Sequence, residues 1–87
     1  MIKNLRKIID SGESQTVEFK STFGKEAIES IVAFVNTKGG KLIIGVDNNK
    51  KIIGVQTSSE TLQKWINQIK QNTNPAVIPE VYETTMS

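Results

Sequence analysis

The sequence predicts an α+β fold, a two-layer sandwich in which a mixed β-sheet carries packed helices in the order α-β-α-β-β-α-β. Three observations lead to this class. Apolar residues recur at helical spacing over residues 25–37, which predicts an amphipathic helix. Residues 42–46 form a continuous apolar stretch rich in β-branched side chains, which predicts a central strand covered on both faces. A polar turn over residues 47–50 then leads into apolar residues 52–55, which we expect to return antiparallel.

The elements before the central strand follow from shorter patterns. Residues 2–10 predict a short amphipathic helix, and residues 16–20 alternate as a half-buried strand. We expect Thr22 to cap the helix over residues 25–37. Gly39-Gly40 should end that helix, because glycine adopts the left-handed conformation without steric cost.

The elements after the hairpin are a helix and an extended segment. Thr57 and Glu60 have the spacing of a capping box, which predicts a helix start at this point. The inner face of this helix is apolar and consists of Leu62, Trp65, Ile66 and Ile69. Residues 77–84 are predicted to be a final extended segment.

The length and composition predict one small globular domain over residues 1–87. Hydrophobic residues make up 37% of the chain and charged residues 23%, which excludes the disordered class. No apolar run approaches the roughly 20 residues that a membrane-spanning helix needs, and no secretory signal opens the chain. The absence of cysteine fits a cytoplasmic protein. Since no closing pattern ends the sequence, we expect it to be the N-terminal fragment of a longer protein.

The chain contains neither histidine nor cysteine, and this excludes whole classes of site. Catalysis by Ser-His-Asp or Cys-His groups is impossible, as are imidazole and thiolate metal sites. A base or metal ligand must be Asp, Glu, Lys or a backbone oxygen. Oxygen ligands favour Mg²⁺, Mn²⁺ or Ca²⁺ over Zn²⁺.

Glu13, Glu18 and Asp47 form the candidate catalytic and metal-binding group. Together they could hold one or two divalent cations and activate a water against a phosphodiester. On a continuous strand, however, Glu13 and Glu18 would point to opposite faces, and their backbones would be about 16 Å apart. Their carboxylates therefore converge only if the chain bends around residues 14–16. The structural alternative is that Glu13 follows a helix end, Glu18 pairs with Lys20 or another lysine, and Asp47 caps its turn.

Positive charge is concentrated in the first part of the chain. Residues 1–51 carry nine Lys/Arg and six Asp/Glu, a net charge of +3, whereas residues 52–87 carry two and three, a net charge of −1. The lysines near predicted element ends could form a basic rim that contacts phosphates without reading sequence: Lys20, Lys38, Lys41, Lys50 and Lys51. The alternative is ordinary solvated lysines. The Gly-Gly pair lies between a helix and a following strand, the reverse of a phosphate-binding loop, and this order favours a structural turn over a nucleotide site.

Several segments in combination resemble the Schlafen AlbA-like domain family. They are Glu13-x4-Glu18-Phe-Lys20, Ala33-Phe-Val-Asn36-Thr-x-Gly39-Gly40, Leu42-Ile-Ile-Gly45-Val-Asp47 and Ile53-Gly54-Val55. The resemblance runs from about residue 10 to about residue 70. It implies a DNA-binding domain of a bacterial or archaeal transcriptional regulator, many of which continue into an ATPase-like segment and a winged helix.

The same resemblance implies an alternative function. Animal Schlafens cleave structured RNA with two related lobes and a three-carboxylate site, and the residues matching that site are Glu13, Glu18 and Asp47. We therefore predict a DNA-binding homodimer that needs no cofactor and contacts no membrane, with DNA favoured over RNA. The alternatives are an endoribonuclease dependent on Mg²⁺ or Mn²⁺, and a dimerisation or interaction scaffold.

Overall fold

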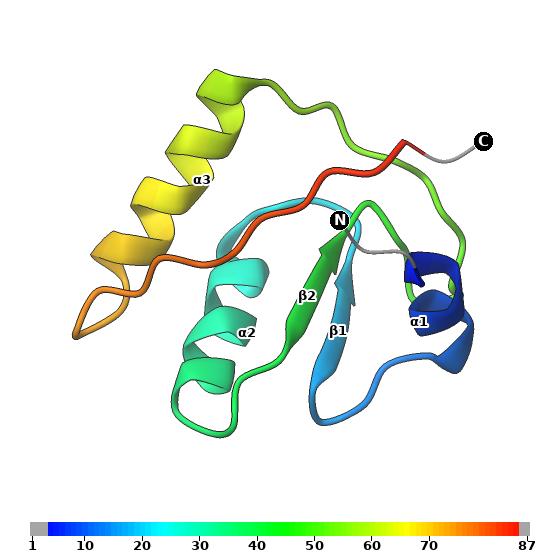
Figure 1. Cartoon of the computed structure of the whole chain (residues 1–87), viewed down its shortest axis with the longest axis horizontal. Helices are drawn as coiled ribbons and strands as arrows, with labels where there is room; N and C mark the ends of the chain where they lie inside the picture. The colour runs from blue at the N-terminus through cyan, green and yellow to red at the C-terminus, as the bar shows by residue number, and fades with distance from the viewer. Residues whose placement is uncertain (1–3, 86–87) are drawn as a thin grey trace.

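The computed structural model describes residues 4–85, which form three helices and a two-stranded parallel sheet (Figure 1). In chain order the elements are α1 (Leu5–Ser11), β1 (Val17–Lys20), α2 (Lys25–Val35), β2 (Lys41–Ile44) and α3 (Ser59–Gln71). The α+β class is therefore confirmed, while the order α-β-α-β-α matches the predicted order only in part. Within residues 4–85, no helix has the length and apolar character needed to cross a membrane.

The sheet is parallel, whereas the sequence predicted a mixed one. Its register runs from Val17 opposite Lys41 to Lys20 opposite Ile44, and α2 is the long connection that parallel pairing requires. The predicted antiparallel strand over residues 52–55 is reduced to one bridge between Val46 and Ile52. The reason is that the amides of residues 53 and 54 both donate to the carbonyl of residue 45, at 2.8 and 2.9 Å, so the chain curls around that carbonyl.

The predicted extended segment over residues 77–84 forms no strand. Pro79 has no N–H to donate to a ladder, and the amide of Val77 donates to the Thr73 hydroxyl oxygen at 2.8 Å. Figure 1 shows this part of the chain, coloured orange to red, running from the end of α3 as an irregular trace. Its side chains remain accessible, since Ile78 is 72% exposed and Tyr82 is 50% exposed.

Helices lie on both faces of the sheet, where the sequence predicted two layers. On one face α1 packs through Ile9, which forms the buried core cluster with Phe19 and Val46. On the other face α2 packs through Ala27, which is 1% exposed. The third helix contacts α2, and the Trp65 ring stacks on the Phe23 ring with centroids 4.8 Å apart.

Two of the predicted helix starts are displaced. The N-cap of α2 is Gly24 rather than Thr22, and it makes no side-chain capping hydrogen bond. The N-cap of α3 is Ser58, whose hydroxyl oxygen accepts from the amide of Thr61 at 3.1 Å. The predicted cap, Thr57, instead donates its hydroxyl to a Glu83 carboxylate oxygen.

The helix predicted over residues 25–37 ends at Val35, and the Gly-Gly pair forms the turn that follows it. Gly39 has a φ of 88°, and its amide donates to the Phe34 carbonyl at 2.9 Å. A Cβ on Gly40 would lie 2.6 Å from the Phe34 ring and 2.8 Å from the Thr16 carbonyl oxygen. The second glycine is therefore required for close approach of the backbone, which supports the structural interpretation of this pair.

Candidate nucleic-acid interface

Asp47 organises the turn that follows β2. Its Oδ1 accepts hydrogen bonds from the amides of Asn49 and Lys51, at 2.8 and 2.9 Å. Backbone bonds close the same turn: the Asp47 amide donates to the Lys51 carbonyl, and the Lys50 amide donates to the Asp47 carbonyl. This is the capping role expected of a short acidic side chain that can bond to nearby amides.

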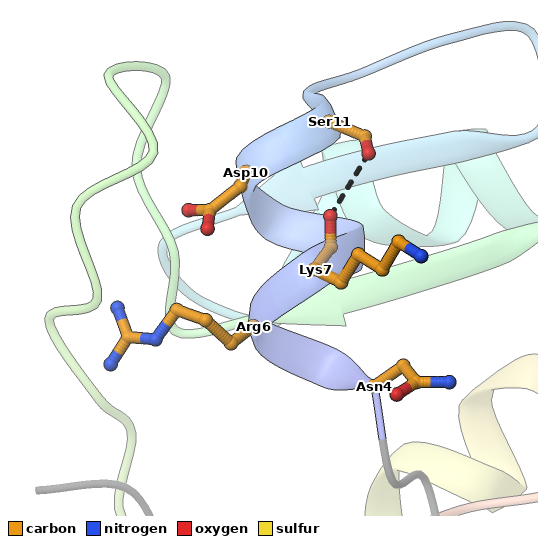
Figure 2. A pocket seen from close by; sticks show the side chains of 5 residues that line it. All are labelled: Asn4, Arg6, Lys7, Asp10 and Ser11. Atoms are coloured by element: carbon orange, nitrogen blue, oxygen red, sulfur yellow. Dashed lines mark hydrogen bonds between the residues drawn. The ribbon is translucent and has the colours of Figure 1, made fainter.

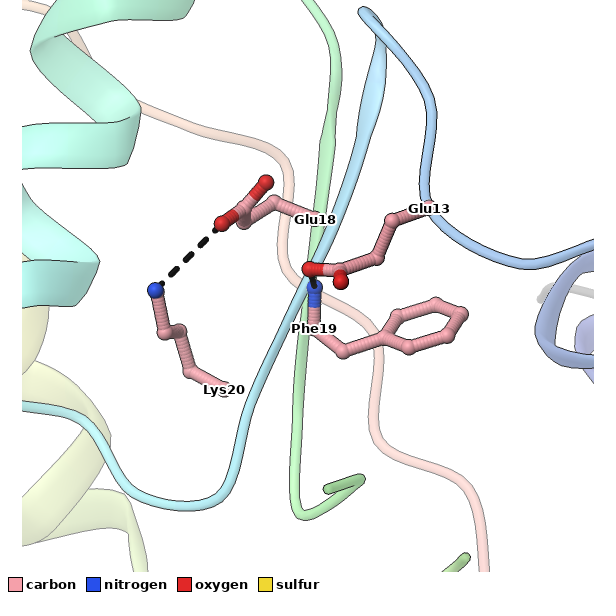
Figure 3. A network of polar contacts seen from close by, with 4 residues as sticks. All are labelled: Glu13, Glu18, Phe19 and Lys20. Atoms are coloured by element: carbon pink, nitrogen blue, oxygen red, sulfur yellow. Dashed lines mark hydrogen bonds and ion pairs between the residues drawn. The ribbon is translucent and has the colours of Figure 1, made fainter. Parts of the chain in front are cut away.

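Glu13 binds the backbone of β1. The chain does bend after this residue, because the Ser14 amide donates to the Val17 carbonyl at 2.9 Å. The bend brings Glu13 Oε2 to 3.1 Å from the Phe19 amide nitrogen, which donates to it (Figure 3). The carboxylate thus satisfies a backbone donor that β2 does not reach.

Glu18 lies on the opposite face of β1 from the Phe19 ring. Figure 3 shows the Glu18 and Lys20 side chains extending to one side of the strand and the Phe19 ring to the other. The Lys20 Nζ lies 3.3 Å from the Glu18 Oε1, and both side chains are partly exposed. Glu18 also lines an open hollow of about 250 Å³ between the bend and α2, with Ser14, Gln15, Ser30, Ala33, Phe34 and Thr37.

The three candidate carboxylates therefore make three separate sets of contacts. Glu13 accepts from a strand amide, Glu18 pairs with Lys20, and Asp47 caps a turn. In the part of the chain that the structure describes, no three acidic side chains gather closely enough to hold a metal ion. The three-carboxylate site stays a prediction, and metal binding there would require these side chains to move closer together.

The five predicted lysines fall into two groups at opposite ends of the sheet. Lys38 and Lys41 lie at the amino end of β2, where Lys41 is its first residue. Lys20 lies at the carboxyl end of β1, and its carbonyl accepts from the Gly45 amide at 2.8 Å. Lys50 and Lys51 belong to the turn beyond the carboxyl end of β2. The strand alone spans about 10 Å at about 3.3 Å per residue, so the five lysines do not form one continuous rim.

Four of these lysines form no salt bridge within residues 4–85. Across residues 4–85 the pair formed by Lys20 and Glu18 is the only salt bridge. The other four lysines are exposed: Lys38, Lys41, Lys50 and Lys51. Exposed, uncompensated cations at element ends can contact phosphate oxygens without rearrangement of the fold.

The predicted set omitted two further cations, Arg6 and Lys7. Both are exposed on α1, because Leu5, Ile8 and Ile9 form the inward face of that helix. The helical spacing of those apolar residues indicated this exposure. What it could not indicate was the position of α1, whose last turn contacts Lys50: the Lys50 Nζ donates to the Asp10 carbonyl at 3.0 Å.

Comparison with known proteins places this arrangement in a family. The family model described as "Schlafen, AlbA_2" matches residues 13–87, which include the bend, both strands, and α2 and α3. The chain belongs to the Schlafen AlbA_2 family. No curated protein and no solved structure matches the chain. Of the three helices in the described part of the chain, α1 lies outside the matched segment.

Proposed function

We propose that the chain is the DNA-binding domain of a cytoplasmic transcriptional regulator and contacts backbone phosphates through exposed lysines. Family membership is compatible with nucleic-acid binding, and the observation that carries the proposal is the set of four exposed lysines without carboxylate partners among residues 4–85. Phosphate contacts position a protein on a duplex but carry no sequence information. Binding should therefore be salt-sensitive and weakly sequence-selective.

The two groups of lysines make different contributions in this proposal. Lys50 and Lys51 lie in the turn beyond the carboxyl end of β2, and the Lys50 Nζ contacts the last turn of α1, so this end carries exposed cations from two elements. Lys38 and Lys41 lie at the other end and would contact phosphates farther along the duplex. We expect the loss of either pair to weaken binding, with the larger effect at the turn.

Titration of a short labelled DNA duplex with the protein at increasing salt concentrations tests this proposal by fluorescence anisotropy. Each phosphate interaction that a variant removes should reduce the slope of log affinity against log salt by about 0.9. The variant Lys50→Gln/Lys51→Gln should therefore have a slope smaller by about 1.8. Affinity that does not change with salt, or lysine variants of both groups that bind like the original chain, would refute the proposal.

We also propose that the functional form is a homodimer. Large apolar side chains are exposed on the segments that flank α3: Ile53, Val55, Ile78, Val81 and Tyr82. The hydrogen bond between Thr57 and Glu83 connects these two segments, so Val55 and Tyr82 belong to neighbouring parts of the surface. A second copy would remove this apolar area from water. Sedimentation equilibrium that shows only monomer at micromolar concentration would contradict this part of the proposal.

A further inference from the structure

We propose that α1 provides an additional phosphate-contacting surface, formed by Arg6 and Lys7, and that its Arg6 side adjoins the turn that carries Lys50 and Lys51. The inference rests on the proposed DNA-binding function and assigns part of it to a helix outside the family segment. We call these four residues the α1 basic surface. Its ligand is the sugar-phosphate backbone of duplex DNA.

The first step is that α1 is fixed to the body of the domain. Ile9 is 1% exposed and belongs to the core cluster with Phe19 and Val46, and Leu5 packs against the same cluster. The outward side of the helix carries Arg6 and Lys7, both exposed. The buried contacts hold the helix backbone in place, so only the long side chains must be ordered when they meet a phosphate.

The second step is that the turn lysines meet the last turn of this helix. The Lys50 Nζ donates to the Asp10 carbonyl at 3.0 Å, and its Cε would lie 3.3 Å from a Cβ on Gly12. A carbonyl is a neutral acceptor, so this contact positions the ammonium group without cancelling its charge. The contact places a cation of the turn after β2 directly beside α1.

The third step is that Arg6 extends toward the same side. Arg6 precedes Asp10 by four residues, which is about one helical turn or 6 Å along the axis. Figure 2 shows the Arg6 and Asp10 side chains extending to one side of α1, where the pale green loop after β2 runs, and the Lys7 side chain extending to the other. Both cations line an open hollow of about 430 Å³ on the outer side of the helix, with Asn4, Asp10 and Ser11.

Asp10 is the one acidic side chain among the residues that line this hollow. Neither Arg6 nor Lys7 forms a salt bridge with it within the described residues. A carboxylate at this position repels phosphate, so its removal should strengthen binding. Replacing Asp10 should therefore raise the affinity for DNA, whereas replacing Arg6 or Lys7 should lower it.

Anisotropy titrations of the full 87-residue chain with duplex DNA, between about 50 and about 200 mM salt, test the inference. The test variant is Arg6→Gln/Lys7→Gln. Its matched control is Lys64→Gln/Lys70→Gln, which removes the same charge from exposed positions on α3. Each phosphate contact accounts for an approximately 3.5-fold fall in affinity between these two salt concentrations. If the variant loses two contacts, the ratio of its affinity at low salt to its affinity at high salt should be about 12-fold smaller than for the original chain. The α3 control should keep the original slope, and Asp10→Asn should bind more tightly, most clearly at low salt.

The outcomes separate this inference from the function on which it rests. If the original chain binds with strong salt dependence but the α1 variant binds identically, the α1 basic surface is refuted while the DNA-binding proposal stands. An equal loss of slope in the α3 control also refutes it, because the effect would then reflect net charge alone. If the original chain shows no salt-dependent binding, the proposed function itself fails. The Asp10→Asn variant keeps the inference falsifiable even if the double variant is unstable, since unchanged or weaker binding contradicts it.

Discussion

Replacing Asp47 by alanine separates a structural role of this carboxylate from a catalytic one. In the structure the Asp47 Oδ1 accepts two amide hydrogen bonds, from Asn49 and Lys51. A hydrogen bond of this kind contributes about 0.5–1.5 kcal/mol net, so Asp47→Ala should lower the free energy of unfolding by about 1–3 kcal/mol. Asp47→Asn keeps an oxygen acceptor in place of Oδ1, and we expect it to retain more than half of that stability.

Urea denaturation followed by Trp65 fluorescence measures this difference. Trp65 is the single tryptophan, and its ring stacks on Phe23, so its emission reports the packing of α3 against the rest of the domain. The urea concentration at the midpoint of unfolding should shift, while the slope of the unfolding free energy against urea concentration stays constant, as expected when only stability changes. No destabilisation by alanine would show that the two amide hydrogen bonds do not stabilise the fold. Equal destabilisation by alanine and asparagine would refute the expectation that a neutral oxygen acceptor is enough, because the stability would then depend on the negative charge.

Three further outcomes follow from the remaining contacts. Glu13→Ala should cost about 1–3 kcal/mol of stability in the same urea assay, because the Phe19 amide loses its acceptor, and Glu13→Gln should recover much of that loss. The Tyr82 hydroxyl donates to Glu80 at 2.7 Å, and this hydrogen bond, followed by the negative charge of Glu80, raises the pKa of Tyr82 above 10.0. Tyr82 is the single tyrosine, so a spectrophotometric titration should place its midpoint above 10.0, and Glu80→Ala should move the midpoint back toward that value. Incubation with tRNA and Mn²⁺ should give no cleavage that depends on Asp47; cleavage abolished by both Asp47→Ala and Asp47→Asn would support the nuclease alternative instead.

The interior of the domain was largely predictable from local patterns. The apolar spacing of α2, the continuous apolar run of β2 and the alternation in β1 each identify an element and its apolar side from short-range sequence alone. The helix and strand boundaries shifted by one or two residues, as at the N-cap of α3, where adjacent serine and threonine residues compete for the capping position.

The predictions that failed concern segments whose structure depends on a partner elsewhere in the chain. Residues 52–55 have strand-like composition, yet the carbonyl of Gly45 accepts the amides of both Ile53 and Gly54, and this local arrangement replaces a ladder. Residues 77–84 contain apolar side chains but pair with no strand in the described part of the chain. A pattern of side chains cannot specify pairing by itself, because a strand is completed by hydrogen bonds to another segment.

The sequence by itself determined the α+β class, the resemblance to the Schlafen AlbA-like family, and the restriction of any site to oxygen ligands and lysine. Those properties depend on residue types and short-range spacing. Only the tertiary structure decided which charged groups meet. It divides the five lysines between the two ends of the sheet and brings Lys50 to the end of α1, 40 residues away in sequence. Contacts of that range depend on how the elements pack, and no local pattern encodes them.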